Sequence, residues 1–130
     1  MKRILLVEDS TTQAFFTTRV LEKNGYEVIV ATNGDEGIEY ARQMSPDLVI
    51  MDVVMPGANG FQATRAITTG VKTRHIPVVM LSSKDQTADK VWALRQGAIN
   101  YLVKPVQEKE LIATVGHLLG QSVTSGKQNG

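Results

Sequence analysis

The sequence predicts an α/β fold in which helices cover both faces of a parallel sheet. Two observations carry this prediction. Apolar runs long enough for one buried strand each lie at residues 4–7, 26–31, 48–51, 76–83 and 99–105. Between and after these runs, apolar residues recur at the three- and four-residue spacing of amphipathic helices. Strands that alternate with helices in this way form parallel sheets, because each helix returns the chain to the start of the next strand.

The start and stop residues of the helices set their expected bounds. One of the hydroxyl residues 10–12 caps the first helix, and the Asn24-Gly25 pair ends it. The later helices are expected at residues 37–44, 61–69, 88–96 and 111–119.

Helical periodicity also predicts which side chains are buried. On the first helix, Phe16 and Val20 share a face, with Leu21 beside them, that we expect to pack on the sheet. Phe15 falls on the polar side with Arg19. We expect Trp92, on the fourth helix, to be partly exposed. The alternating pattern of residues 26–31 predicts a less enclosed strand than the others.

Length and composition indicate one globular domain. The chain has 130 residues, of which 42% are hydrophobic and 21% charged, and its formal net charge is +1. This charge gives no reason to expect a nucleic-acid partner, and the absence of cysteine excludes disulfides and thiolate metal sites. We expect one folded domain at residues 1–120 and a disordered polar tail at 121–130.

The amino-terminal apolar run is too short for export or for membrane insertion. Glu8 and Asp9 interrupt it directly after Val7. We therefore expect a cytoplasmic protein.

Polar side chains follow four of the apolar runs at the point where each strand should end. They are Glu8 and Asp9, Asp52, Ser82 and Lys104. Because the carboxyl ends of parallel strands lie on one rim of the sheet, these groups are expected to converge. Three carboxylates at one place repel one another and favour a cation, and a set of oxygen ligands without His or Cys favours Mg²⁺.

A lysine and a hydroxyl opposite such a carboxylate complement a phosphoryl group. The lysine supplies positive charge and the hydroxyl a hydrogen bond. A carboxylate that attacks a phosphoryl donor forms an aspartyl phosphate, with catalysis supplied mainly by positioning and charge neutralisation.

Four motifs in this order carry a resemblance to a known family. They read LLVEDS, MDVVMPGANG, IPVVMLSS and GAINYLVKP. With the strand and helix alternation, they make residues 2–120 resemble the receiver domain of two-component response regulators, of the stand-alone chemotaxis (CheY-like) type. The stretches NGFQATRAI and KDQTADKVWALRQGA further resemble PilH-like regulators, which serve chemotaxis-like systems that control type IV pili and twitching motility.

The resemblance implies a flavodoxin-like (βα)5 sandwich with strand order 2-1-3-4-5. It implies that Asp52 accepts a phosphoryl group from a CheA-like sensor histidine kinase. It further implies that Glu8, Asp9, Asp52 and the carbonyl of Val54 hold Mg²⁺, and that Lys104 binds the acyl phosphate. The protein would then catalyse its own phosphorylation and dephosphorylation and would not be a conventional enzyme.

The resemblance also implies a switch. Ser82 would move toward the phosphoryl group and Tyr101 would turn inward, so that the fourth helix, fifth strand and fifth helix form the face that a target protein reads. Output by protein contact is expected because the chain ends soon after the fifth helix. The Lys104-Pro105 bond is expected to be cis. Ser82 stands where threonine is commoner in the family, and Val54 offers an apolar side chain where some relatives have a polar one.

Three other functions share parts of this pattern. A flavodoxin-like FMN carrier would use residues 10–12 to bind phosphate, but it lacks a glycine there and the preceding acids would repel the phosphate. A haloacid-dehalogenase-type phosphatase would need an acid at Val54. A receiver fold that acts as an interaction module without phosphorylation is the third alternative, against which the complete set of Asp9, Asp52, Ser82 and Lys104 argues.

Overall fold

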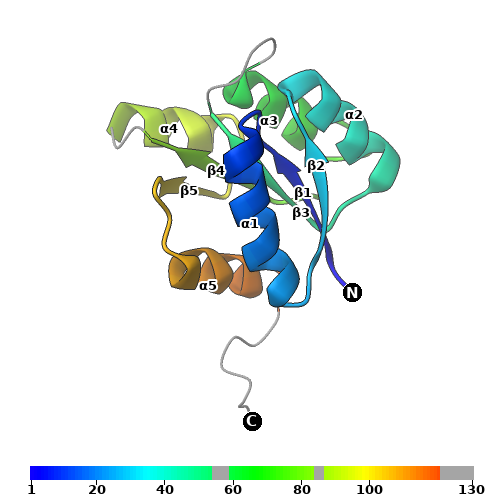
Figure 1. Ribbon diagram of the computed structural model, residues 1–130. Coiled ribbons are helices and arrows are strands. Elements are labelled where there is room, and N and C mark those ends of the chain that lie inside the picture. Colours follow the sequence, from blue (N-terminus) through cyan, green and yellow to red (C-terminus); the bar gives the residue numbers. More distant parts are fainter. Residues whose placement is uncertain (54–58, 84–86, 121–130) are drawn as a thin grey trace.

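Strands and helices alternate along the chain, as the sequence predicts. The computed structural model describes residues 1–53, 59–83 and 87–120. Within these residues the elements are β1 Arg3–Val7, α1 Thr11–Lys23, β2 Glu27–Ala31, α2 Gly34–Met44, β3 Leu48–Asp52, α3 Gly60–Thr69, β4 Val78–Ser82, α4 Thr87–Arg95, β5 Asn100–Val103 and α5 Glu108–Leu118 (Figure 1).

The strands form one parallel sheet in the order β2-β1-β3-β4-β5, which confirms the expected order. β3 lies at its centre, and every residue of β3 is buried. β2 lies at one edge, and four of its five residues are exposed or half-buried, in agreement with its predicted less enclosed position.

Alternate residues of each strand belong to two separate cores. In β3, Val49 and Met51 face the core that α2, α3 and α4 cover. Leu48 and Ile50 face the opposite core, which α1 and α5 cover (Figure 1). This alternation is the reason why a central strand of a doubly covered sheet reads as a continuous apolar run.

Side-chain caps fix where the helices begin. The Gln13 N–H donates to Ser10 Oγ at 3.3 Å, so Ser10 caps α1. The Glu36 N–H donates to Asn33 Oδ1 at 2.8 Å, and α2 therefore begins at Gly34, three residues before the expected Gly37.

The prediction for Phe16 was wrong. Its side chain is 64% exposed, whereas Ala14 and Leu21 are the buried residues of α1. Phe16 lies nearly opposite Ala14 around the helix, and α1 rests on the sheet through small and aliphatic side chains instead. Phe15 is exposed as expected, with the Arg19 guanidinium carbon 5.6 Å from its ring centre.

Helix α4 has little of its surface buried. Only Ala93 is fully covered, whereas Val91, Trp92 and Leu94 are exposed. The exposed fraction of Trp92 is 48%, which confirms the prediction of partial exposure.

No helix in the described part of the chain is long and apolar enough to cross a membrane. The predicted tail at residues 121–130 lies outside the described residues.

Candidate functional site

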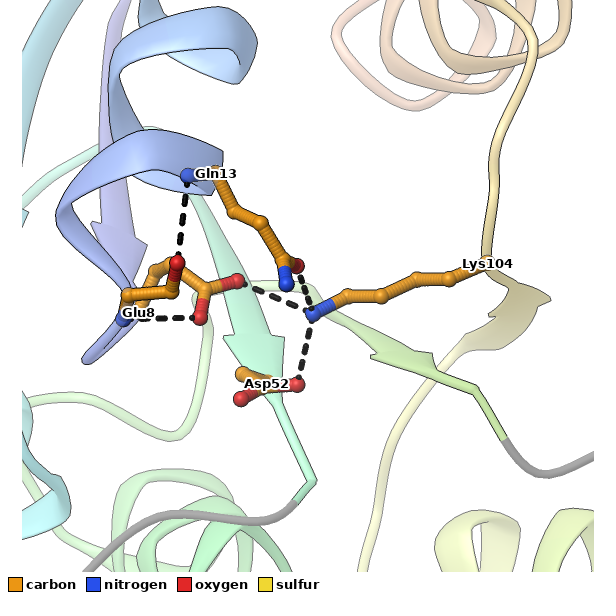
Figure 2. Close-up of polar contacts among 5 residues, drawn as sticks. Glu8, Gln13, Asp52 and Lys104 are labelled. Atoms are coloured by element: carbon orange, nitrogen blue, oxygen red, sulfur yellow. Dashed lines mark hydrogen bonds and ion pairs between the residues drawn. The ribbon is translucent and has the colours of Figure 1, made fainter.

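The carboxyl ends of β1, β3 and β5 meet at one rim of the sheet and bring the predicted side chains together. Glu8 directly follows β1, Asp52 is the last residue of β3, and Lys104 directly follows β5. Figure 2 shows the Lys104 side chain reaching across the rim to both acids. The predicted convergence of these groups is therefore correct.

The acidic cluster consists of Glu8, Asp9 and Asp52. One carboxylate oxygen from each lies within 4.8 Å of the others. Glu8 and Asp52 are buried, whereas Asp9 is exposed at the entrance. The cluster thus has one side that solvent reaches and two acids held by the protein.

The Lys104 ammonium bridges the two buried acids of this cluster. Its Nζ donates to Glu8 Oε1 at 3.0 Å, to Asp52 Oδ1 at 3.0 Å and to Gln13 Oε1 at 2.6 Å. An ammonium group has three N–H donors, so all of them are used. The Lys104 side chain is only 18% exposed, which strengthens these charge-assisted bonds relative to surface pairs.

The sequence did not suggest that Gln13 contacts Lys104. It lies in the first turn of α1, and its amide oxygen completes the shell around the Lys104 ammonium. The only available signal was a polar residue in the turn that follows the acids, and many solvent-exposed helix residues fit that description. The contact depends on where β5 places Lys104, 91 residues later in the chain.

Burial and charge shift two pKa values in the cluster. Burial raises the pKa of the Glu8 carboxyl above its ordinary value, and the negative charge of Asp52 adds to the increase, although hydrogen bonds from Lys104 and from the Ser10 N–H oppose it. Burial lowers the pKa of the Lys104 ammonium, but hydrogen bonds to Asp52 and Glu8 and their charges outweigh this effect and raise it overall. The lysine therefore stays charged.

One oxygen of the Asp52 carboxylate accepts no hydrogen bond from the described residues. Within the described ranges, only Lys104 donates a hydrogen bond to this carboxylate, and it does so to Oδ1. The backbone of Asp52 is held closely, because a Cβ on Gly60 would fall on the Asp52 carbonyl oxygen. The Gly60 N–H also donates to the Val53 carbonyl at 2.9 Å. The first residue of α3 therefore holds the backbone of Asp52 in place.

Ser82 and Tyr101, the two residues of the predicted switch, are both buried. Asp52 pairs with Leu81 across the sheet, so Ser82 is the next residue toward the rim, and it is almost fully buried. The Lys104 N–H donates to the Ser82 carbonyl at 2.7 Å. Tyr101 is 9% exposed and belongs to the core under α3 and α4. The Lys104-Pro105 bond is cis, as expected.

The donor set fits a magnesium ion. Three carboxylates and one ammonium leave a net charge of −2, which one divalent cation balances. All the side-chain donors are hard oxygens, which Mg²⁺ prefers. Val54, whose carbonyl was the fourth expected ligand, lies outside the described residues.

The same geometry disfavours the flavin alternative. The Ser10 N–H, at the amino end of α1, donates to Glu8 Oε2 at 3.2 Å. A carboxylate therefore occupies the place that a flavin phosphate would take at that helix end.

Comparison with known proteins yields consistent matches. The sequence profile of the response regulator receiver domain matches residues 4–116. Protein PilH of Pseudomonas aeruginosa is 52% identical over 119 residues, which are 92% of this chain and 98% of that protein.

Solved structures agree in fold. The chemotaxis protein CheY4 of Vibrio cholerae superposes with a TM-score of 0.86 at 30% identity, covering 91% of this chain and 98% of that one. The receiver domain of sensor histidine kinase PA1611 from Pseudomonas aeruginosa, solved with a magnesium ion coordinated in its active site cleft, has a TM-score of 0.86 at 28% identity. That match covers 92% of this chain and 98% of the other.

Proposed function

The chain belongs to the response regulator receiver domain family, and from this premise we propose that Asp52 accepts a phosphoryl group from a histidine kinase in a Mg²⁺-dependent reaction. The phosphorylated protein then signals by contact with a target protein. The observation that carries the proposal is the Asp52 carboxylate at the sheet rim, with Oδ1 held by Lys104 and the other oxygen accepting no hydrogen bond from the described residues.

The chemistry follows from these positions. The available oxygen of Asp52 attacks the phosphorus of a phosphohistidine, the phosphorus–nitrogen bond breaks, and the aspartyl phosphate forms. Lys104, already beside Asp52, neutralises the negative charge of the transferred group, and the Ser82 hydroxyl donates a hydrogen bond to it. Water then attacks the phosphorus of this acyl phosphate, the bond between phosphorus and the Asp52 oxygen breaks, inorganic phosphate leaves, and Asp52 returns to its carboxylate.

Glu8, Asp9 and Asp52 are the residues of the described chain that would hold Mg²⁺. The ion supplies positive charge that offsets the repulsion between the carboxylates and an incoming phosphoryl group. Because Lys104 spans the buried acids and Asp9 is exposed, Asp9 gives the ion its approach from solvent.

This chain has an apolar surface beside the site on which a phosphodonor protein can dock. A groove of about 420 Å³ beside Lys104 is lined mainly by Phe16, Val20, Leu81 and Val106. Phe15 and Phe16 extend this surface along α1, with ring centres 6.1 Å apart. A helical segment that carries a phosphohistidine would cover these side chains while its imidazole reaches Asp52. A CheA-like kinase is the donor that the family resemblance favours.

The readout is proposed for the face made by α4, β5 and α5. Drawing the Ser82 hydroxyl toward the phosphoryl group moves the end of β4, the strand that precedes α4 in the chain. Tyr101 is already packed in the core in this structure, so the switch is a change in the populations of two packings and not an unfolding step. The 52% identity to PilH supports a role in chemotaxis-like control of type IV pili.

The test is covalent labelling by a small phosphodonor. Wild type and Asp52→Asn are incubated with acetyl phosphate and Mg²⁺, and intact mass is measured. We expect one added phosphoryl group on wild type, none on Asp52→Asn, and none on wild type with excess chelator. Equal labelling of both proteins would contradict the assignment, and a wild type that binds its target equally well without labelling would favour the unphosphorylated interaction module.

A further inference from the structure

A second polar site lies at the opposite end of the sheet from Asp52. Three arginines line one hollow of about 440 Å³ between α3 and α4, near the amino ends of β4 and β5. Arg65 comes from α3, Arg74 from the segment before β4, and Arg95 from the last residue of α4. Among the residues that the structure describes, no acidic residue lines this hollow.

The described part of the chain offers these arginines no partner. In residues 1–53, 59–83 and 87–120, none of the three guanidinium groups makes a hydrogen bond or an ion pair. Nearby backbone carbonyls already accept hydrogen bonds from threonine hydroxyls. Thr68 Oγ1 donates to the Gln96 carbonyl and Thr69 Oγ1 donates to the Arg65 carbonyl, each at 2.6 Å. The guanidinium groups therefore remain available for an external anion.

The walls of the hollow are held in fixed positions. Gly97 has a φ of +100°, and a Cβ there would fall on the Thr68 side chain. The end of α4 thus packs directly against the end of α3, and the Thr68–Gln96 hydrogen bond joins them. The Arg74 backbone is also held, because its N–H donates to the Gly70 carbonyl at 2.8 Å. Arginines on a fixed backbone lose less freedom on binding than arginines on a mobile loop.

The basic hollow continues into an apolar one. An adjoining hollow of about 520 Å³ shares Arg65 and Gln96 and is lined by Phe61, Ala66 and Trp92. Together the two hollows form a trough along α3. This helix has ten residues and is therefore about 15 Å long. Trp92 is 48% exposed at the apolar end. A ligand that fills the trough must be anionic at one end and apolar at the other.

We propose that this trough binds an acidic peptide segment of a partner protein. Its carboxylates pair with Arg65, Arg74 and Arg95, whose planar guanidinium groups match carboxylates through paired hydrogen bonds. An apolar side chain of the same segment packs on Phe61 and Trp92. A nucleic acid would use an extended basic surface, whereas the net charge of this chain is only +1 and half of the trough is apolar.

The experiment uses the full chain without Mg²⁺ or phosphodonor, so its outcome is independent of the proposed phosphorylation. The probe is a fluorescein-labelled peptide in which a run of glutamates precedes two phenylalanines, and binding is followed by anisotropy. We expect Arg74→Gln and Arg95→Gln each to weaken binding about fivefold, and the double variant about twentyfold, from the strength of partly exposed charge pairs. Binding should also shift the emission of Trp92.

Lys72→Gln is the matched control, because Lys72 is exposed and close in sequence to Arg74 but does not line the hollow. It should weaken binding less than about twofold, as expected for a screened surface charge. A peptide with glutamines in place of the glutamates should not bind, and one with serines in place of the phenylalanines should bind more weakly. Three results would overturn the proposal. The first is an equal loss of binding for Lys72→Gln and the arginine variants, and the second is no binding of the peptide at all. The third is arginine-dependent binding of pyrophosphate or RNA that is tighter than binding of the peptide.

Discussion

Lys104 carries more of the local stability than a surface lysine would. Lys104→Met removes the ammonium but keeps most of the volume of the side chain. It leaves the buried carboxylates of Glu8 and Asp52 facing each other without their shared cation. We expect the variant to fold with a lower free energy of unfolding.

The size of the loss follows from the contact geometry. At an effective dielectric constant of about 20, one charge pair at the observed 3.0 Å is worth about 5.5 kcal/mol before solvation. Lys104 makes two such pairs, but taking each ion out of water costs several kcal/mol. Because the Lys104 side chain is still 18% exposed, we expect a net loss of about 2–3 kcal/mol.

The loss should depend on pH and on Mg²⁺. Without its bond from Lys104, the pKa of Glu8 rises further above the ordinary value of 4.5. A carboxyl with a raised pKa in the folded state stabilises the fold fully below its unfolded pKa, and that contribution is lost as pH rises. The difference in free energy of unfolding between wild type and Lys104→Met should therefore grow as pH rises from about 4.5 to neutrality. Mg²⁺ should bind the variant about tenfold more tightly, returning about 1.4 kcal/mol of stability.

The assay is urea unfolding of wild type, Lys104→Met and Lys23→Met at two pH values, with and without Mg²⁺. Lys23 is the control, because it pairs with Glu108 at 2.7 Å but both side chains are about half exposed. Its replacement should change the free energy of unfolding by less than about 1 kcal/mol. Equal losses for the two lysine variants, or equal stabilisation of both by Mg²⁺, would refute the reasoning.

Three further substitutions test other parts of the structure. Gly60→Ala should lower both stability and the rate of labelling by acetyl phosphate, because the added Cβ displaces the backbone of Asp52; circular dichroism and intact mass measure the two effects. Ser82→Ala should reduce the response of the single tryptophan to beryllofluoride and Mg²⁺ while Mg²⁺ still binds, and a response like that of wild type would exclude coupling through this hydroxyl. Phe16→Ala should change the free energy of unfolding by about 0.5 kcal/mol at most, because the Phe16 side chain is exposed. Leu21→Ala, at a buried residue, should lower it by about 2–5 kcal/mol. Similar losses for the two variants would mean that Phe16 is buried.

The sequence by itself determined the kind of fold and most of the rim. Val49 and Met51 alternate with Leu48 and Ile50 in a run that only a strand covered on both faces can bury. Once the strands are parallel, their carboxyl ends lie on one rim, so the residue that ends each apolar run is placed without further information. For this reason Asp52 and its partners were predictable although they are far apart in the chain.

The tertiary structure alone decided which helix faces are covered and which distant side chains touch. Phe16 had the periodicity of a core residue, but the close packing of α1 through Ala14 and Leu21 leaves it in solvent. Gln13 contacts Lys104 only because α1 and the end of β5 lie on the same side of the rim.

The arginine hollow shows the same limit. Arg65, Arg74 and Arg95 are unremarkable polar positions in sequence, and they line one hollow because Gly97 lets the end of α4 approach α3. Local pattern determines which elements form and where strands end, since these depend on neighbours in the chain. Contacts between side chains of different helices depend on how closely the elements pack, and that is set by the whole core at once.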